Sequence, residues 1–86
     1  MKIVLHKNFE KRLSQLPQNI KSKFKEKMNV FLKDPYNPAL NNHPLKGKNK
    51  GFRSINITAD VRALYKRSKE DYFIFVEIGN HSNLYK

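Results

Sequence analysis

Histidine and arginine supply much of the chemistry that this sequence could perform near neutral pH. His81 lies in the segment Ile78-Gly79-Asn80-His81, directly after an apolar stretch, where a sheet would present it at its rim. An imidazole in this position can take up or release a proton near neutrality. Spacing alone leaves open that His81 is an ordinary turn residue and that Tyr85 is an aromatic plug of the core.

Several classes of active site are missing from the sequence. There is no Ser-His-Asp elbow, P-loop, glycine-rich dinucleotide motif or cluster of carboxylates for magnesium. The remaining His, Lys, Arg and Tyr side chains suit cleavage of RNA by its own 2′-hydroxyl. One group removes the proton, another protonates the leaving 5′-oxygen, and a cation stabilises the phosphorus centre. We therefore expect no metal and no small-molecule cofactor.

The charge of the chain favours a polyanionic partner. Eighteen Lys and Arg against seven Asp and Glu give a net charge of +11, and residues 1–50 alone hold twelve basic and three acidic side chains, or +9. Such an excess attracts nucleic acid and speeds its encounter. An acidic protein partner would also suit this surface, and simple solubility is the plainer alternative.

Residues 36–51 form a long, irregular connection that is rich in Pro, Asn and Lys. A connection of this length in a small domain is usually functional. Lys46, Lys48 and Lys50 alternate with small or polar residues and could hold a phosphate backbone. The alternative is that His43 only shapes the loop and that these lysines are solvated.

The hydrophobic pattern predicts an α+β domain over residues 1–86. Apolar residues recur at helical spacing from Asn8, a possible N-cap, to Leu16, and again from Pro17 to the stop at Asp34-Pro35. Strands are predicted at 3–5, 52–57, 61–66 and 72–78. In this β-α-α-β-β-β order, two N-terminal helices would pack on one face of a four-stranded, mainly antiparallel sheet.

Strand alternation predicts which side chains occupy the uncovered face of the sheet. In the strand 61–66, Arg62, Leu64 and Lys66 share one face, and we place Arg62 on the open side. In the last strand, strict alternation groups Ile78 with the even-numbered residues from Tyr72 and sends Glu77 the opposite way, with Phe73 and Phe75.

The compartment is predicted from what the sequence lacks. It contains no cysteine, and its N-terminal apolar run is far too short for a signal peptide or a membrane span. We therefore expect a cytoplasmic protein with no membrane partner.

Four blocks of the sequence carry a resemblance to a known family. They are His43-Pro-Leu-Lys-Gly47, Gly51-Phe-Arg53, Asp60-Val-Arg62-Ala-Leu-Tyr65 and Ile78-Gly-Asn-His81-Ser-Asn-Leu-Tyr85. Their order and spacing resemble the RelE superfamily of toxin-antitoxin ribonucleases, and most of all its YafQ branch. The terminal block is the most specific, and the likeness covers the whole chain.

The resemblance implies a toxin that cuts messenger RNA, commonly on the ribosome, and that a cognate antitoxin protein inhibits. It implies that His81 is the principal acid or base and that His43 assists. It also implies roles in the active site for Asp60, for Arg62 at the scissile phosphate, and for Tyr85. The implied RNA-binding residues are Lys46, Lys48, Lys50 and Arg53.

The sequence departs from the YafQ pattern at Asn56, Val61 and Glu77, where such proteins often carry histidine, tryptophan and arginine. An amide cannot shuttle a proton, and Glu77 would repel phosphate if it faced the cleft. Two alternatives share the scaffold: a ParE-like toxin that binds a DNA topoisomerase, and an RNA-binding module without activity. ParE-like proteins generally lack the terminal histidine, so His81 favours the ribonuclease.

Overall fold

The computed structural model describes residues 2–68 and 71–84, so the predicted role of Tyr85 lies outside the described residues. The helices are α1 (Lys7–Ser14), α2 (Gln18–Lys33) and the short α3 (His81–Leu84). The strands are β1 (Lys2–Leu5), β2 (His43–Pro44), β3 (Arg53–Asn56), β4 (Val61–Arg67) and β5 (Tyr72–Asn80). Two single 3-10 turns, Pro38–Leu40 and Gly47–Asn49, interrupt the connection between α2 and β3. None of the described helices is long and apolar enough to cross a membrane.

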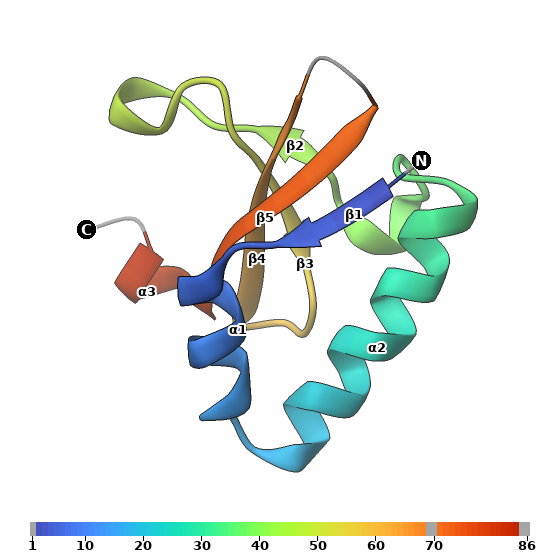
Figure 1. Cartoon of the computed structure of the whole chain (residues 1–86), viewed down its shortest axis with the longest axis vertical. Coiled ribbons are helices and arrows are strands. Elements are labelled where there is room, and N and C mark those ends of the chain that lie inside the picture. The colour runs from blue at the N-terminus through green and yellow to red at the C-terminus, as the bar shows by residue number, and fades with distance from the viewer. Residues whose placement is uncertain (1, 69–70, 85–86) are drawn as a thin grey trace.

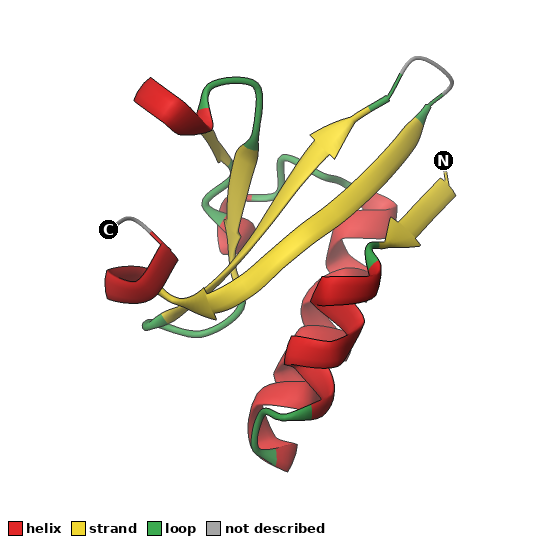
Figure 2. Ribbon diagram, turned by 60° about the vertical axis from the view of Figure 1, so that its left-hand side comes forward, coloured by secondary structure: helices red, strands yellow, loops and turns green. Residues whose placement is uncertain are grey.

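The strands form one sheet in the order β1-β5-β4-β3-β2 (Figure 1). β1 runs parallel to β5, and the other neighbours are antiparallel. The helices α1 and α2 lie together on one side of the sheet (Figure 2). The predicted α+β class is confirmed. The sheet has five strands instead of four, because the two-residue β2 pairs with the outer edge of β3.

The first helix begins earlier than predicted. Its N-cap is His6 and not Asn8, because the Nδ1 atom of His6 accepts the backbone N–H of Asn8 at 3.1 Å. A side-chain acceptor satisfies one of the free N–H groups in the first turn of a helix. The second helix starts directly after Pro17, close to the predicted start. Proline is tolerated at the start of a helix because the N–H group that it lacks would have no partner within the helix there.

Aromatic side chains fill the space between the helices and the sheet. Phe31 of α2 is fully buried, and its ring centroid lies 5.2, 5.3 and 5.4 Å from those of Tyr65, Phe73 and Phe75. These edge-to-face contacts add to the stabilisation from burial. Ala63 and Tyr65 belong to this core, so the predicted facing of β4 is confirmed and Arg62 lies on the open face.

A β-bulge changes the facing of β5. Tyr65 pairs with Phe75, but the next residue along β4, Leu64, pairs with Glu77, so Val76 is the extra residue. A bulge reverses the alternation beyond it. Ile78 therefore joins Phe73 and Phe75 in the core, and Glu77 lies on the open face with Leu64. The grouping predicted from strict alternation is wrong for this half of the strand.

Candidate functional site

The end of β5 and the turn between β3 and β4 meet at one corner of the sheet. The backbone N–H of His81 donates to the carbonyl oxygen of Asp60 at 2.9 Å. Asp60, Asn80, His81 and Ser82 line a cleft of about 320 Å³, and all four residues are exposed. The structure thus brings the imidazole and the carboxylate that the sequence singled out within reach of one bound ligand.

Arg62 lies beside this corner but does not line its cleft. Its backbone pairs with Gly79, two residues before His81. Its Nη1 atom donates to the carbonyl oxygens of Thr58 and Ala59 at 3.0 and 2.7 Å. The guanidinium is therefore held against the β3–β4 turn, on the strand next to β5.

Asn56 faces Arg62 across the β3–β4 pair, on the open side of the sheet. Its Oδ1 atom is buried and has no hydrogen-bond partner among the residues that the structure describes. An unpaired buried acceptor is costly and rare in folded proteins. The amide thus lies beside a cation, although it cannot act as a proton carrier.

The structure does not bring His43 to this corner. His43 lies in β2, opposite Ser54, and its Nδ1 atom is 2.8 Å from the carbonyl oxygen of Asn41. A carbonyl oxygen only accepts, so Nδ1 carries the proton in this contact. Three strand spacings, about 14 Å in total, separate β2 from β5. His43 therefore lies apart from the cleft that contains His81.

The predicted RNA-binding residues fall in two places. Lys46, Lys48 and Lys50 are exposed on the connection between β2 and β3, which extends away from the helices (Figure 1). Arg53 instead lies on the helix side, where its Nε atom donates to Asn42 Oδ1 at 2.7 Å. Its guanidinium lies 5.3 Å from the ring centroid of Tyr36.

Arg53 belongs to a small polar network at the edge of the core. The Nδ2 atom of Asn42 donates to the hydroxyl of Tyr65 at 2.6 Å and to the carbonyl oxygen of Pro35 at 2.8 Å. Burial raises the pKa of Tyr65 above its ordinary value, and the hydrogen bond from Asn42 opposes this rise. These contacts attach the long connection to the sheet, so the surroundings of Arg53 point to a structural role.

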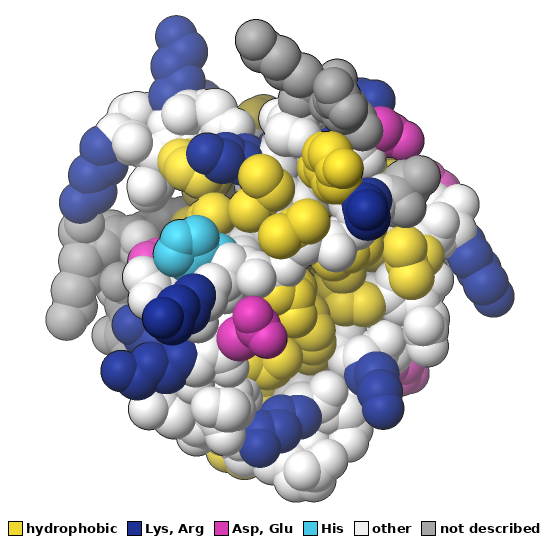
Figure 3. All heavy atoms as spheres, viewed as in Figure 1, with side chains coloured by type: hydrophobic (Ala, Val, Ile, Leu, Met, Phe, Trp, Pro, Cys, Tyr) yellow, Lys and Arg dark blue, Asp and Glu magenta, His cyan; other side chains and the backbone are white. Residues whose placement is uncertain are grey.

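The open face carries a second cleft, of about 410 Å³, which we call the open-face cleft. Its apolar residues are Phe52, Leu64, Val76 and Leu84, and its polar residues are His6, Asn8, Lys48, Asn49 and Glu77. Over β1 and β5, hydrophobic side chains gather with Lys and Arg side chains around them (Figure 3). Sequence reasoning missed His6. The available signal was its position where the chain leaves β1 to begin a helix.

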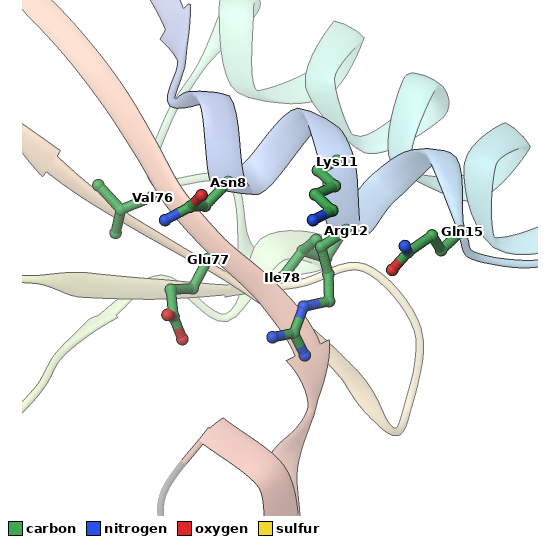
Figure 4. Close-up of a pocket in the computed structure, with 7 residues that line it drawn as sticks. All are labelled: Asn8, Lys11, Arg12, Gln15, Val76, Glu77 and Ile78. Carbon is green, nitrogen blue, oxygen red and sulfur yellow. The ribbon is translucent and has the colours of Figure 1, made fainter.

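A third cleft, of about 400 Å³, lies along the side of α1 and β5 and shares residues with the open-face cleft. Asn8, Lys11, Arg12 and Gln15 of α1 line it together with Val76, Glu77 and Ile78 of β5. Asn8 and Arg12 extend from α1 toward β5, where Glu77 projects from the strand (Figure 4). Asn8, Val76 and Glu77 line both clefts. The cations of α1, which sequence reasoning also missed, therefore lie next to the open face.

Across residues 2–68 and 71–84, no three His, Asp or Glu side chains are grouped as the ligands of a metal ion would be. The clefts are lined by carboxylate, imidazole, amide and guanidinium groups. Such groups can bind a ligand that carries phosphate and hydrogen-bonding groups, and the imidazole and carboxylate can also transfer protons to or from it.

Comparisons with solved structures agree with this architecture. YafQ from E. coli strain BL21(DE3) superimposes with a TM-score of 0.81 at 21% sequence identity, covering 99% of this chain and 98% of that chain. A copper-bound mutant toxin from Helicobacter pylori is 31% identical, with a TM-score of 0.69 and 99% coverage of both chains. The toxin-antitoxin complex of DinJ and YafQ from E. coli matches with a TM-score of 0.78 at 21% identity, covering 99% of this chain and 97% of that chain.

The family assignment rests on the sequence itself. No curated protein is similar enough to the chain to count as a match. A family profile described as the bacterial toxin of type II toxin-antitoxin systems, YafQ, matches residues 1–86. The chain therefore belongs to the YafQ family of type II toxins.

Proposed function

We propose that this toxin is an endoribonuclease that cuts messenger RNA without a metal ion, with the 2′-hydroxyl as nucleophile. The observation that carries the proposal is the shared cleft of His81 and Asp60 at the end of β5. An imidazole that is exposed beside a carboxylate can act as acid or base on a bound phosphodiester. Asp60 would orient the imidazole toward the substrate.

Arg62 would stabilise the charge that grows on the phosphate. It lies on the strand adjacent to β5, and its guanidinium remains charged at any relevant pH. The two carbonyl oxygens that hold it in this structure are neutral acceptors, which a phosphate oxygen could replace with a stronger, charge-assisted partner.

The surface charge supports an RNA substrate, on or off the ribosome, and an inhibitory antitoxin. The net charge of +11 favours association with a polyanion. An antitoxin with an acidic or amphipathic segment could fold across this basic protein and cover its active site. The solved complex of DinJ with YafQ is a precedent for such a pair within the family.

The test is to incubate the protein with translating ribosomes and, separately, with free messenger RNA, and to map the new RNA ends. Codon-phased cuts on ribosomes support the proposal and its ribosomal setting, whereas cuts in free RNA support cleavage alone. His81→Ala should reduce the rate about 100- to 10,000-fold, the usual contribution of a positioned acid or base. Its melting temperature should stay unchanged, because His81 is exposed.

The matched control is His43→Ala, which removes an imidazole that lies outside the His81 cleft. We expect a much smaller loss of rate from this variant. Full activity of His81→Ala would reject the assignment. RNA binding without cuts by the wild-type protein would favour an inactive RNA-binding module, and inhibition of a DNA topoisomerase would favour the ParE-like alternative.

A further inference from the structure

Glu77 is a carboxylate on a face of the sheet that we expect to bind RNA, where it would repel phosphate. It is exposed on the open face, opposite Leu64, because the bulge at Val76 turns it away from the core. The described ion pairs are Lys23–Glu26 and Arg67–Asp71, and in the described part of the chain none involves Glu77. Its carboxylate therefore makes no ion pair there, although Lys11, Arg12 and Lys48 line the same clefts and attract it at longer range.

A carboxylate on an RNA-binding surface needs hydrogen-bond donors from the ligand. Phosphate oxygens would repel it, but the edges of nucleobases carry N–H groups. Glu77 lines both the open-face cleft and the third cleft, beside α1 and β5. A base bound in the open-face cleft would therefore lie within reach of the Glu77 carboxylate.

The open-face cleft has the composition of a site for a flat, partly polar ring. Phe52, Leu64, Val76 and Leu84 give it apolar walls, and Phe52 offers an aromatic surface on which a base can stack. The carboxamides of Asn8 and Asn49 lie in the same cleft and can donate to a base carbonyl.

The pattern of hydrogen-bonding groups selects one base. Guanine presents two adjacent donors, N1–H and N2–H, which match the two oxygens of a carboxylate. Uracil offers one N–H between two carbonyl oxygens, and adenine and cytosine each place a ring acceptor beside their amino group. In these three bases an acceptor would face one of the carboxylate oxygens.

We propose that the open-face cleft is a guanine-binding site, in which Glu77 accepts hydrogen bonds from N1–H and N2–H of a base in the RNA substrate. This inference rests on the proposed function and adds base specificity to it. Lys11 and Arg12, in the adjoining cleft between α1 and β5, would then contact the phosphate next to that base.

The first experiment changes the ligand and leaves the protein intact. Fluorescence titration measures the affinity of the full chain for short 2′-O-methyl RNAs, which cannot be cleaved, with uridine on both sides of one tested base. The tested bases are guanine, inosine, adenine and cytosine. Inosine lacks only the N2 amino group of guanine, so we expect it to bind about 5- to 100-fold more weakly, the discrimination typical of a bidentate contact.

The second experiment changes the carboxylate. Glu77→Gln keeps the size of the side chain but offers one acceptor in place of two, and it should abolish the preference for guanine over inosine. Glu26→Gln is the matched control, because it removes the same charge from an exposed residue of α2, away from the cleft. This control should keep the full preference.

Equal binding of guanine and inosine by the wild-type protein would overturn the proposal, as would an unchanged preference in Glu77→Gln. Because these RNAs are not cleaved, the result does not depend on catalysis. Base-selective binding by a protein that cuts no RNA would therefore reject the proposed ribonuclease activity and leave the guanine site standing.

Discussion

The two faces of the sheet are made from the same strands but have opposite properties. On the helix face, Phe31 and Phe75 are fully buried in contact with other rings. On the open face, Leu64 is buried to a similar degree, yet the polar side chains of Glu77 and Asn49 line the same cleft as Leu64. The comparison teaches that one face provides stability, while the other leaves hydrogen-bonding groups available to a ligand.

Two arginines on neighbouring strands show the same division. Arg53 of β3 lies on the helix side, held by Asn42 and Tyr36. Arg62 of β4 lies on the open side, next to the end of β5. Both were predicted to act on RNA, but only Arg62 lies near the cleft of His81.

The largest expected difference between the faces is in stability. Phe31→Ala should lower the free energy of unfolding by about 3–5 kcal/mol, because it leaves a cavity among three aromatic rings. Val4→Ala on the open face, where Val4 is 41% exposed, should change it by about 0.5 kcal/mol or less. Urea denaturation measures both. Similar values for the two variants would contradict the division between the faces.

Replacing each of the two arginines should affect a different property, the cleavage rate for Arg62 and the stability for Arg53. Arg62→Ala should slow RNA cleavage by about 100-fold or more, with a smaller loss of affinity, since charge builds on the phosphate in the transition state. Arg53→Ala should keep the cleavage rate but lower the free energy of unfolding by about 1–3 kcal/mol, because the partly buried Asn42 loses a hydrogen bond from a charged group. If Arg53→Ala slows cleavage and leaves stability intact, the structural role given to Arg53 is wrong.

The exposed lysines of the β2–β3 connection should affect salt dependence more than stability. Replacing Lys46, Lys48 and Lys50 with glutamine should reduce the slope of log affinity for RNA against log salt by about 2, for three lost phosphate contacts. The control replaces Lys23, Lys25 and Lys33, exposed lysines of α2 that lie on the helix layer. A slope that changes equally in both triple variants would assign the effect to net charge.

The smallest expected effect is the pH dependence of stability that comes from Tyr65, on the helix face. Burial raises the pKa of the Tyr65 hydroxyl above 10.0, so the unfolded chain loses this proton first as pH increases. The stabilisation from Tyr65 is therefore complete below pH 10 and declines as the pH rises from there through the folded-state pKa. Urea denaturation on both sides of pH 10 should show a steeper decline in the wild type than in Tyr65→Phe.

Particular elements show how far the pattern of residues predicts structure. The second helix was predicted from Pro17 to Asp34, and it spans Gln18–Lys33, because its apolar stripe and its two prolines are local signals. The N-cap of the first helix was misplaced, since histidine is not a usual cap and only the folded chain orients His6 toward Asn8. The position of Arg62 on the open face followed from simple alternation in β4.

Other features of the site depended on contacts between distant segments. The approach of Asp60 to His81 arises from the pairing of β4 with β5, which neither segment shows by itself. The bulge at Val76 brought Glu77 to the open face and Ile78 into the core, and both residues were assigned by strict alternation to the opposite grouping. His43 and Arg53 were grouped with the site by motif, although pairing places them elsewhere.

The sequence by itself determined the class of the fold, the family, the basic charge and the residue types available for chemistry. These follow from composition, short-range periodicity and motif spacing, all of which are read along the chain. Only the tertiary structure decided which of those residues share a cleft. Strand register and a one-residue bulge set the facing of every later side chain, and both result from packing among segments far apart in the sequence.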